Sequence, residues 1–408
     1  MHLFLKRIFV ACATLILPLH AEPSVLVSLA SVGGRVRAQN PDLAAARLLI
    51  QEAVGRMNQS GRPANPDLQT SVEHNSRFRE GRIEIGISQR FPITDRLRLE
   101  KSISLTQLEA SQAEVREIER QLSGKARMAV VRILATRQRR DLLREQSALS
   151  HEWIGFLSAS AKKGEGSALD AGQAKLDSAS LTIEICQLDA AEAAQVGELK
   201  PLLGMLPGAA LSVGGTLPPP TLPSPATDPE KRPDFQMAKL DAQAAGQGVA
   251  LERARRYDDV EGGIFTAAER IEDAPEGVRD EAILGLRLKV ALPFWNKNEG
   301  AIHEAESRKI RKEKEALALG RGILMEAEGA RAEMEAWMKM IHEIDTSLLP
   351  LAVEQVSLAE ATFRSGQGEM QSVLRSRGKR IQLASARLDA LREFHLARVR
   401  HETALATR

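Results

Sequence analysis

The chain contains two copies of one succession of segments. In each copy an alternating apolar and polar segment ends at a proline, a long helical region follows, and a glycine-marked turn precedes a shorter helical region. Pro293 follows Pro92 by 201 positions, and Gly366 follows Gly164 by 202. Because the offset hardly changes, the long helical regions of the two copies have matching lengths, and we expect two related halves.

Residues 22–208 make up the first copy, and residues 232–408 make up the second. Each copy opens with a similar signal, Asn-Pro-Asp-Leu at residues 40–43 and Arg-Pro-Asp-Phe at residues 232–235, before an alanine-rich amphipathic stretch. The segment between the copies, residues 209–231, is rich in proline and glycine, which disfavour the interiors of helices and sheets. We expect this segment to be an extended linker.

Apolar residues of the long helical regions recur with the spacing of a coiled coil. Each region has about 70 residues and would be about 100 Å long as one helix. Aromatic residues are 3% and charged residues 27% of the chain, which suits narrow helical seams better than wide globular cores. Pro350 interrupts the second region and is expected to bend it. The seam of that region steps by four and three residues through Ile323, Ala327, Ala330, Met334, Trp337, Ile341, Ile344, Leu348 and Leu351.

The alternating segments predict strands with one apolar and one polar face. In residues 82–91 and 282–292 every second residue is largely apolar, and the residues between are mostly polar or small. A less regular partner precedes each of them, at residues 68–72 and 260–271. Each copy therefore supplies one hairpin of strands long enough to cross an outer membrane. We expect the nearby aromatic residues to form interfacial girdles: Phe78, Phe91, Phe265, Phe294 and Trp295.

Arg287 and Lys289 alternate with the apolar residues of the last strand, and we expect both to point into the lumen of a barrel. Four strands cannot close a barrel, and an open sheet edge in lipid leaves backbone groups unpaired. The chain must therefore oligomerise, and three copies would give twelve strands, four from each protomer. The predicted fold is mainly α with a small β part, in which long coiled-coil helices accompany a transmembrane β-barrel that several copies complete.

The N-terminus predicts export. A basic pair precedes a short apolar run, and Ala21 offers a small residue for cleavage, so residues 1–21 have the layout of a secretory signal peptide. Lipidation at Cys12 is the alternative interpretation of this segment. Cleavage leaves Cys186 as the only cysteine, which excludes an intramolecular disulfide and a cysteine metal cluster. No later segment has the roughly 18 apolar residues of a membrane-spanning helix.

This succession of segments resembles the TolC-like outer-membrane efflux family over nearly the whole mature chain. Residues 292–302, Leu-Pro-Phe-Trp-Asn-Lys-Asn-Glu-Gly-Ala-Ile, are similar to the segment that leaves the second hairpin in the heavy-metal branch of that family. Residues 362–374 resemble its aromatic-x-x-Gly motif at the periplasmic tip. The resemblance implies a trimeric duct in the outer membrane, an α-helical barrel of coiled-coil helices continuous with a twelve-stranded transmembrane β-barrel. Its large periplasmic part docks a periplasmic adaptor protein and an inner-membrane pump.

The resemblance also assigns the tip residues that contact the adaptor: Gly164, Asp170, Phe363, Gly366 and Ser372. The glycines are equally expected as helix-terminating turns. Asp170 is expected either as a favourable charge at a helix N-terminus or as one of a ring of acids that constricts the channel. The sequence departs from the family at three positions that lack the usual aromatic, aspartate and alanine residues: Ala161, Ser372 and Ser376.

The sequence contains no catalytic constellation and no paired metal-ligand spacing. It has no phosphate-binding glycine-rich loop and no Gly-x-Ser-x-Gly motif, and its histidines are scattered. Met334 lies on the apolar seam, where methionine fills gaps, and soft-metal transfer is the alternative role for it and Met338. The net charge of +2 indicates no nucleic-acid partner. We expect no enzyme activity, no cofactor and no bound metal.

Two other functions share many of these features. A periplasmic coiled-coil adaptor or structural protein would have the heptads and the export signal, but the two alternating hairpins and the duplication disfavour it. The outer-membrane channel of a type I protein secretion system would share every feature. The resemblance at residues 293–302 favours a passive duct for metal cations or small toxic compounds.

Overall fold

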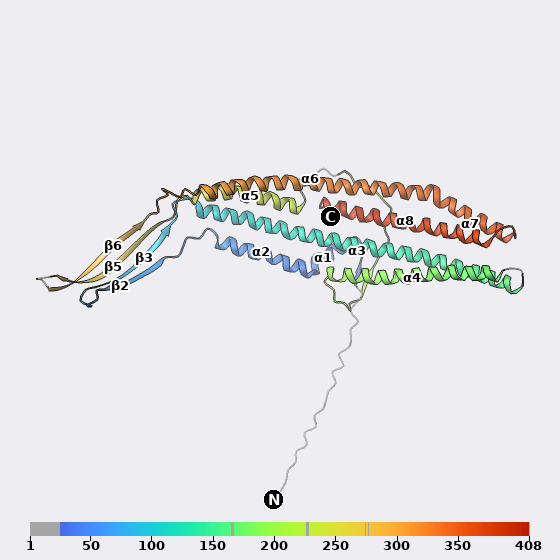
Figure 1. Cartoon of the computed structure of the whole chain (residues 1–408), viewed down its shortest axis with the longest axis horizontal. Coiled ribbons are helices and arrows are strands. Elements are labelled where there is room, and N and C mark those ends of the chain that lie inside the picture. The colour runs from blue at the N-terminus through green and yellow to red at the C-terminus, as the bar shows by residue number, and fades with distance from the viewer. Residues whose placement is uncertain (1–24, 165–166, 226–227, 274, 276, 408) are drawn as a thin grey trace, which may run out of the picture.

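The chain forms a long rod whose two ends differ (Figure 1), as described by a computed structural model. The structure describes residues 25–407 apart from 165–166, 226–227, 274 and 276. A four-stranded sheet lies at one end of the rod, and the helices turn back on themselves at the other. The predicted signal peptide and Cys12 lie outside the described residues.

The two halves share the order helix, hairpin, long arm and return helix. The first half contains α1 (Val32–Gln39), α2 (Pro41–Gln59), β2 (Asp67–His74), β3 (Gly81–Phe91), α3 (Arg96–Lys162) and α4 (Ala168–Leu202). The second half contains α5 (Pro233–Ala254), β5 (Val260–Asp273), β6 (Gly277–Lys289), α6 (Glu299–Glu343), α7 (Leu349–Arg364) and α8 (Met370–Ala404). The first half has an additional short helix, α1, and the long arm of the second half is divided into α6 and α7. In each half the hairpin leads into the long arm, and the arm returns as a shorter helix. None of the described helices is long and apolar enough to span a membrane.

The bend predicted at Pro350 takes the form of a π-helical turn. Residues Ile344–Leu348 are π-helical and directly precede α7, whose second residue is the proline. Proline lacks a backbone N–H, and its ring clashes with the carbonyl group four residues earlier, so the regular ladder cannot continue through it. Figure 1 shows the ribbon turning where α6 meets α7.

The opening signal of the first half caps α2. Asn40 precedes the helix, its Oδ1 accepts from the N–H of Leu43 at 2.8 Å, and Pro41 occupies the first helical position. The same side chain donates through Nδ2 to the carbonyl oxygen of Leu202 at 2.9 Å. One asparagine therefore joins the start of α2 to the end of α4.

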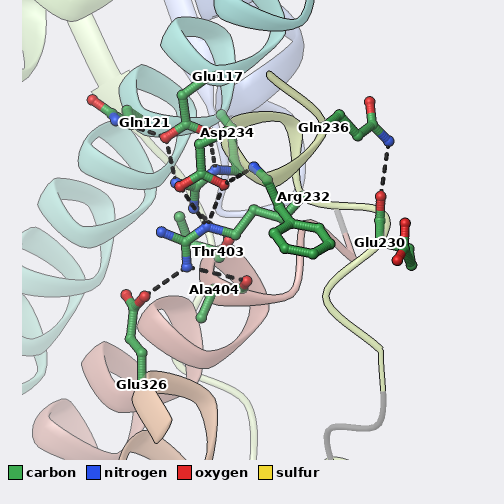
Figure 2. A network of polar contacts seen from close by, with 11 residues as sticks. Glu117, Gln121, Glu230, Arg232, Asp234, Gln236, Glu326, Thr403 and Ala404 are labelled. Carbon is green, nitrogen blue, oxygen red and sulfur yellow. Dashed lines mark hydrogen bonds and ion pairs between the residues drawn. The ribbon is translucent and has the colours of Figure 1, made fainter. Parts of the chain in front are cut away.

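The opening signal of the second half holds the end of α8. Arg232 precedes α5 and is held by Asp234 at 2.9 Å and by Glu326 of α6 at 2.6 Å. Its guanidinium also lies 3.4 Å from the carbonyl oxygen of Ala404, and Figure 2 shows this network around the last turn of α8. Carbonyl groups at a helix C-terminus lack partners within the helix, so a cation placed there stabilises the end.

The largest apolar core lies midway along the rod, where α1, α2, α4 and α8 pack around α3. Its fully buried members include Leu43, Ile133, Leu199 and Phe394. The segment predicted to be a linker contributes a strand that the sequence pattern did not indicate. Leu211–Val213 form β4, which pairs in parallel with β1 (Val25–Val27) against this core.

The four remaining strands form one antiparallel sheet in the order β2-β3-β5-β6. The two hairpins meet where β3 of the first half pairs with β5 of the second, and Ile85 lies opposite Thr266. β2 and β6 are left at the two edges of the sheet, each with one side unpaired by the described strands.

Candidate functional site

One face of the sheet is apolar across all four strands. Strand register places Leu68, Ile87, Ile264 and Leu286 in one row, because side chains opposite each other in a ladder point to the same face. Leu286 and Leu284 are each 85% exposed. A contiguous exposed face of this composition is suited to contact with lipid tails.

The opposite face is polar. Arg287 lies on it and donates to Glu84 at 2.5 Å and to Gln69 at 2.8 Å. Glu84 is only 8% exposed, because Arg82 covers it from the other side at 2.8 Å. Lys289 lies on the same face at the helical end of the sheet and forms no ion pair with a described residue. Arg287 and Lys289 therefore both lie on the polar face, as the alternation of the sequence predicted.

Phe265 lies on the polar face, so its predicted place in a lipid-facing aromatic girdle was wrong. Register places it between Gly86 and Gly285, and a Cβ atom on Gly285 would lie 2.3 Å from the Phe265 ring. The ring lies over Gly285, and the guanidinium of Arg287 lies 5.0 Å from its centroid. Phe91 lies on the apolar face and is 55% exposed, as a girdle residue would be.

At the other end of the rod two glycines make equivalent turns. Gly164 has φ +75° after α3, and Gly366 has φ +73° after α7, a region that residues with a Cβ disfavour. The N–H of Gly366 donates to the carbonyl oxygen of Phe363 at 3.0 Å, and that of Gly164 to Ala161 at 3.2 Å. The two turns are therefore equivalent in their hydrogen bonding as well, because each glycine donates to the residue three positions earlier.

The other predicted tip residues lie in the helices that follow these turns. Asp170 is in the first turn of α4, where Ser167 caps the helix, and it forms no ion pair with any residue that the structure describes. Ser372 is exposed in the first turn of α8. The structure places the predicted set around the two turns but brings no two of its side chains into a polar contact among the described residues.

Three helices meet beside the turns around a tryptophan that sequence reasoning missed. Trp153 of α3 is buried, and its ring lies 6.2 Å from that of Phe363. The guanidinium of Arg377 of α8 lies 4.5 Å from the tryptophan ring and donates to Glu360 of α7 at 2.6 Å. The only available signal was its rarity, because the chain has three tryptophans.

Both lateral edges of the helix array expose apolar stripes. On α4, Leu169, Leu176 and Ile183 recur every seven residues and are each more than 60% exposed. On α6 the exposed apolar residues repeat at the same interval: Ile310, Leu317 and Leu324. Such stripes are the seams of coiled coils, so each edge lacks a partner helix. Among the described residues no three histidine, cysteine or acidic side chains are grouped to hold a metal ion.

Comparison with known proteins identifies the architecture. Residues 32–205, which include α1 to α4, match the family model described as outer membrane efflux protein. No curated relative matches the sequence. The fold resembles crystal structures of CusC (TM-score 0.76, 16% identity, 92% of this chain and 91% of that chain). It also resembles VceC from Vibrio cholerae (TM-score 0.73, 17% identity, 92% of this chain and 95% of that chain). A third similar structure is the Campylobacter jejuni CmeC outer membrane channel (TM-score 0.73, 13% identity, 92% of this chain and 85% of that chain). The chain therefore has the fold of outer-membrane channels over nearly its whole length.

Proposed function

We propose that this chain is an outer membrane efflux protein, three copies of which form a passive export duct. The observation that carries the proposal is the two-faced sheet with unpaired edges at the end of a long helical array. In a closed assembly the apolar face meets lipid, and Glu84, Arg287 and Lys289 line the lumen. The match of residues 32–205 to the efflux family supports the same function.

The unpartnered edges support closure by copies of the chain. The free side of β6 on one protomer can pair with β2 of the next, which removes the open backbone edges that lipid does not tolerate. Along the helices, the leucine stripe of α4 matches the stripe of α6 in spacing and in apolar character. Rotation about a threefold axis satisfies both edges at once and gives a twelve-stranded barrel.

The turn end of the rod is then the periplasmic tip, where an adaptor protein and an inner-membrane pump engage the duct. Gly164, Asp170, Phe363, Gly366 and Ser372 surround this end and would form the contact. The chain supplies a conduit without chemistry, and the pump supplies the energy. For the cargo, the segment at residues 293–302 favours metal cations or small toxic compounds. No specific observation favours protein secretion.

Insertion of the sheet tests this proposal. Leu284→Arg places a charge on the lipid-facing side at a cost of about 2–4 kcal/mol per protomer, and three protomers carry it. Ser71→Arg places the same charge on the lumen-facing side of β2 and is the matched control. We expect the wild type and the control in the outer-membrane fraction of a Gram-negative host, and loss of the Leu284 variant from it. Equal recovery of both variants, or wild type in the soluble fraction, contradicts the proposal.

A further inference from the structure

A cavity of about 750 Å³ lies midway along the rod, beside the largest apolar core, with which it shares Leu134 and Val399. Its lining comes from α1 and the residues before it, from α3 and α8, and from the segment that follows β4. Figure 1 shows α1 and α8 beside α3 in this part of the rod. Every lining residue belongs to one protomer, and a cavity of this volume can hold a small organic ligand.

The first turn of α1 opens into this cavity. Gly33 and Gly34 line it, and their N–H groups have no acceptor among the described residues. The Oγ of Ser123 on α3 is buried beside them, also without a partner in the described part of the chain, and a Cβ atom on Gly33 would lie 3.9 Å from it. The beginning of a helix carries partial positive charge, and its free N–H groups bind anions. Glycines at these positions let a ligand approach the backbone closely.

The side chains of the cavity carry more positive than negative charge. Its ionisable lining residues are three arginines, one carboxylate and one histidine: Arg37, Arg127, Arg398, Glu402 and His395. Glu402 binds both Arg127 and Arg398, so one carboxylate is shared by two guanidinium groups. The third arginine is paired with Glu119, outside the lining. Burial lowers the pKa of His395, which keeps the ring neutral at pH 7, so one positive charge remains in excess.

The remainder of the lining is largely apolar. Leu29, Ala30 and Pro218 contribute to it, and none of the three is buried by the rest of the chain. An inorganic ion at the amides would leave these side chains in water, whereas a ligand with an apolar body would cover them. The lining therefore suits an anion that has an apolar part.

We propose that this cavity binds a small organic anion whose carboxylate or phosphate head lies at the amides of Gly33 and Gly34. These N–H groups and the hydroxyl of Ser123 donate to the head. Arg127 binds Glu402 only through Nη2, so its other N–H groups are available for charge-assisted hydrogen bonds to the ligand. The site goes beyond the proposed export function, because it lies away from both the sheet and the turns and is complete in one protomer.

Four probes with a similar aromatic body and different heads test the chemistry of the ligand: phenyl phosphate, benzoate, benzyl alcohol and benzylamine. Their binding to the full-length protein in a non-ionic detergent would be measured by isothermal titration calorimetry at low salt. We expect at least one of the two anions to bind about tenfold more tightly than benzyl alcohol, and benzylamine to bind least. The tighter anion identifies the head as phosphate or carboxylate. Benzyl alcohol or benzylamine binding as tightly as both anions overturns the proposal.

Two variants locate the site. A Cβ atom on Gly34 meets no atom within 4 Å, so Gly34→Leu can place its side chain over the free amides without a collision. We expect this variant to bind the tighter anion about tenfold more weakly. Gly55→Leu in α2 has equally open surroundings outside the cavity and should bind it like the wild type.

Ser123→Ala is the second variant, and it removes a hydroxyl that has no partner among the described residues. We expect it to fold normally and to weaken binding of the anion about threefold. Thermal unfolding monitored by circular dichroism checks that each variant is folded. Wild-type affinity in both Gly34→Leu and Ser123→Ala overturns the proposal. Because the cavity belongs to one protomer, the result is independent of whether the chain forms a trimer.

Discussion

Arg287 of β6 places its Nη2 atom 2.5 Å from Oε1 of Glu84 on β3, across the intervening strand β5. The two residues come from different copies of the duplicated hairpin. The pair is partly shielded, because Arg82 also donates to Glu84 and the Phe265 ring lies against Arg287. The halves are thus joined on the polar face by side chains as well as by the backbone ladder of β3 and β5.

Reversal of one charge of this pair should weaken the sheet. In Arg287→Glu two carboxylates face each other beside Arg82, and we expect the oligomer to dissociate at a lower temperature in SDS gel electrophoresis. The exchange Glu84→Arg with Arg287→Glu restores opposite charges and should recover part of the loss. An exchange variant that is no more heat-resistant than the single variant contradicts a direct pair.

Gly285 should not tolerate a side chain, because a Cβ atom there would collide with the Phe265 ring. We expect Gly285→Val to reduce the yield of oligomer in the outer membrane, by a few kcal/mol of strain in each protomer. Phe265→Ala removes the obstacle, so the double variant should recover more oligomer than Gly285→Val alone. If it does not, the collision is not the cause of the loss.

Arg232 should matter for the helical body. Its side chain is 11% exposed and binds Asp234, Glu326 and the end of α8. Arg232→Gln removes the cation from both carboxylates, and we expect a loss of about 2 kcal/mol, since Glu326 is half exposed and water compensates part of it. The control Lys239→Gln breaks an exposed pair and should cost less than about 0.5 kcal/mol. Thermal unfolding of the two variants, monitored by circular dichroism, measures this difference in stability.

His401 should make the helical body less stable in mild acid. Burial lowers the pKa of His401, with the nearby Glu402 and Glu328 opposing this effect and Arg331 adding to it, and neither ring nitrogen has a hydrogen-bond partner among the described residues. Below the ordinary histidine pKa of about 6.5 the unfolded chain binds a proton that the folded chain does not, so stability falls as pH falls through that range.

His395 shows the same direction of shift from burial, partly opposed by its hydrogen bond to Pro218, and must be accounted for in the measurement. We expect the melting temperature to fall between pH 7.5 and 5.5 and His401→Leu to reduce that fall. An unchanged pH dependence in this variant assigns the effect to other groups.

Asp170 should influence conduction if three copies place it at the tip opening. It has no cationic partner in the described structure, so Asp170→Lys changes the charge of the opening by six units in a trimer. We expect altered single-channel conductance or leak in planar bilayers. Asp177→Asn, further along α4, is the control. Unchanged channel behaviour in the Asp170 variant leaves that residue as a helix-terminal charge only.

Local patterns were sufficient to predict most of the fold. Heptads predicted the long arms, because apolar residues repeated every seven positions are typical of helices packed along a narrow seam. Alternation of apolar and polar residues predicted β3 and β6. Gly164 follows Pro92 at nearly the same distance as Gly366 follows Pro293, and this predicted equivalent turns. These features depend on neighbours along the chain.

The features that sequence reasoning missed depend on contacts between distant segments. Phe265 lies in a strand with Gly262, Gly263, Ala267 and Ala268, whose small side chains obscure the alternation, so its face is decided by register with β3. Leu211 to Val213 are three residues whose partner strand is nearly two hundred positions away. The setting of Trp153 likewise arises only where α3, α7 and α8 meet, so no local pattern marks it.

The central claim is that three copies close into one outer-membrane duct, and the mass of the native particle tests it most directly. The full-length protein would be extracted from outer membranes in mild detergent and weighed by mass photometry, with the detergent contribution subtracted. The account predicts a particle of three protomers, each 44.6 kDa before removal of the signal peptide. A particle of one or two protomers would contradict it, because no threefold assembly would then cover the two sheet edges and both apolar stripes.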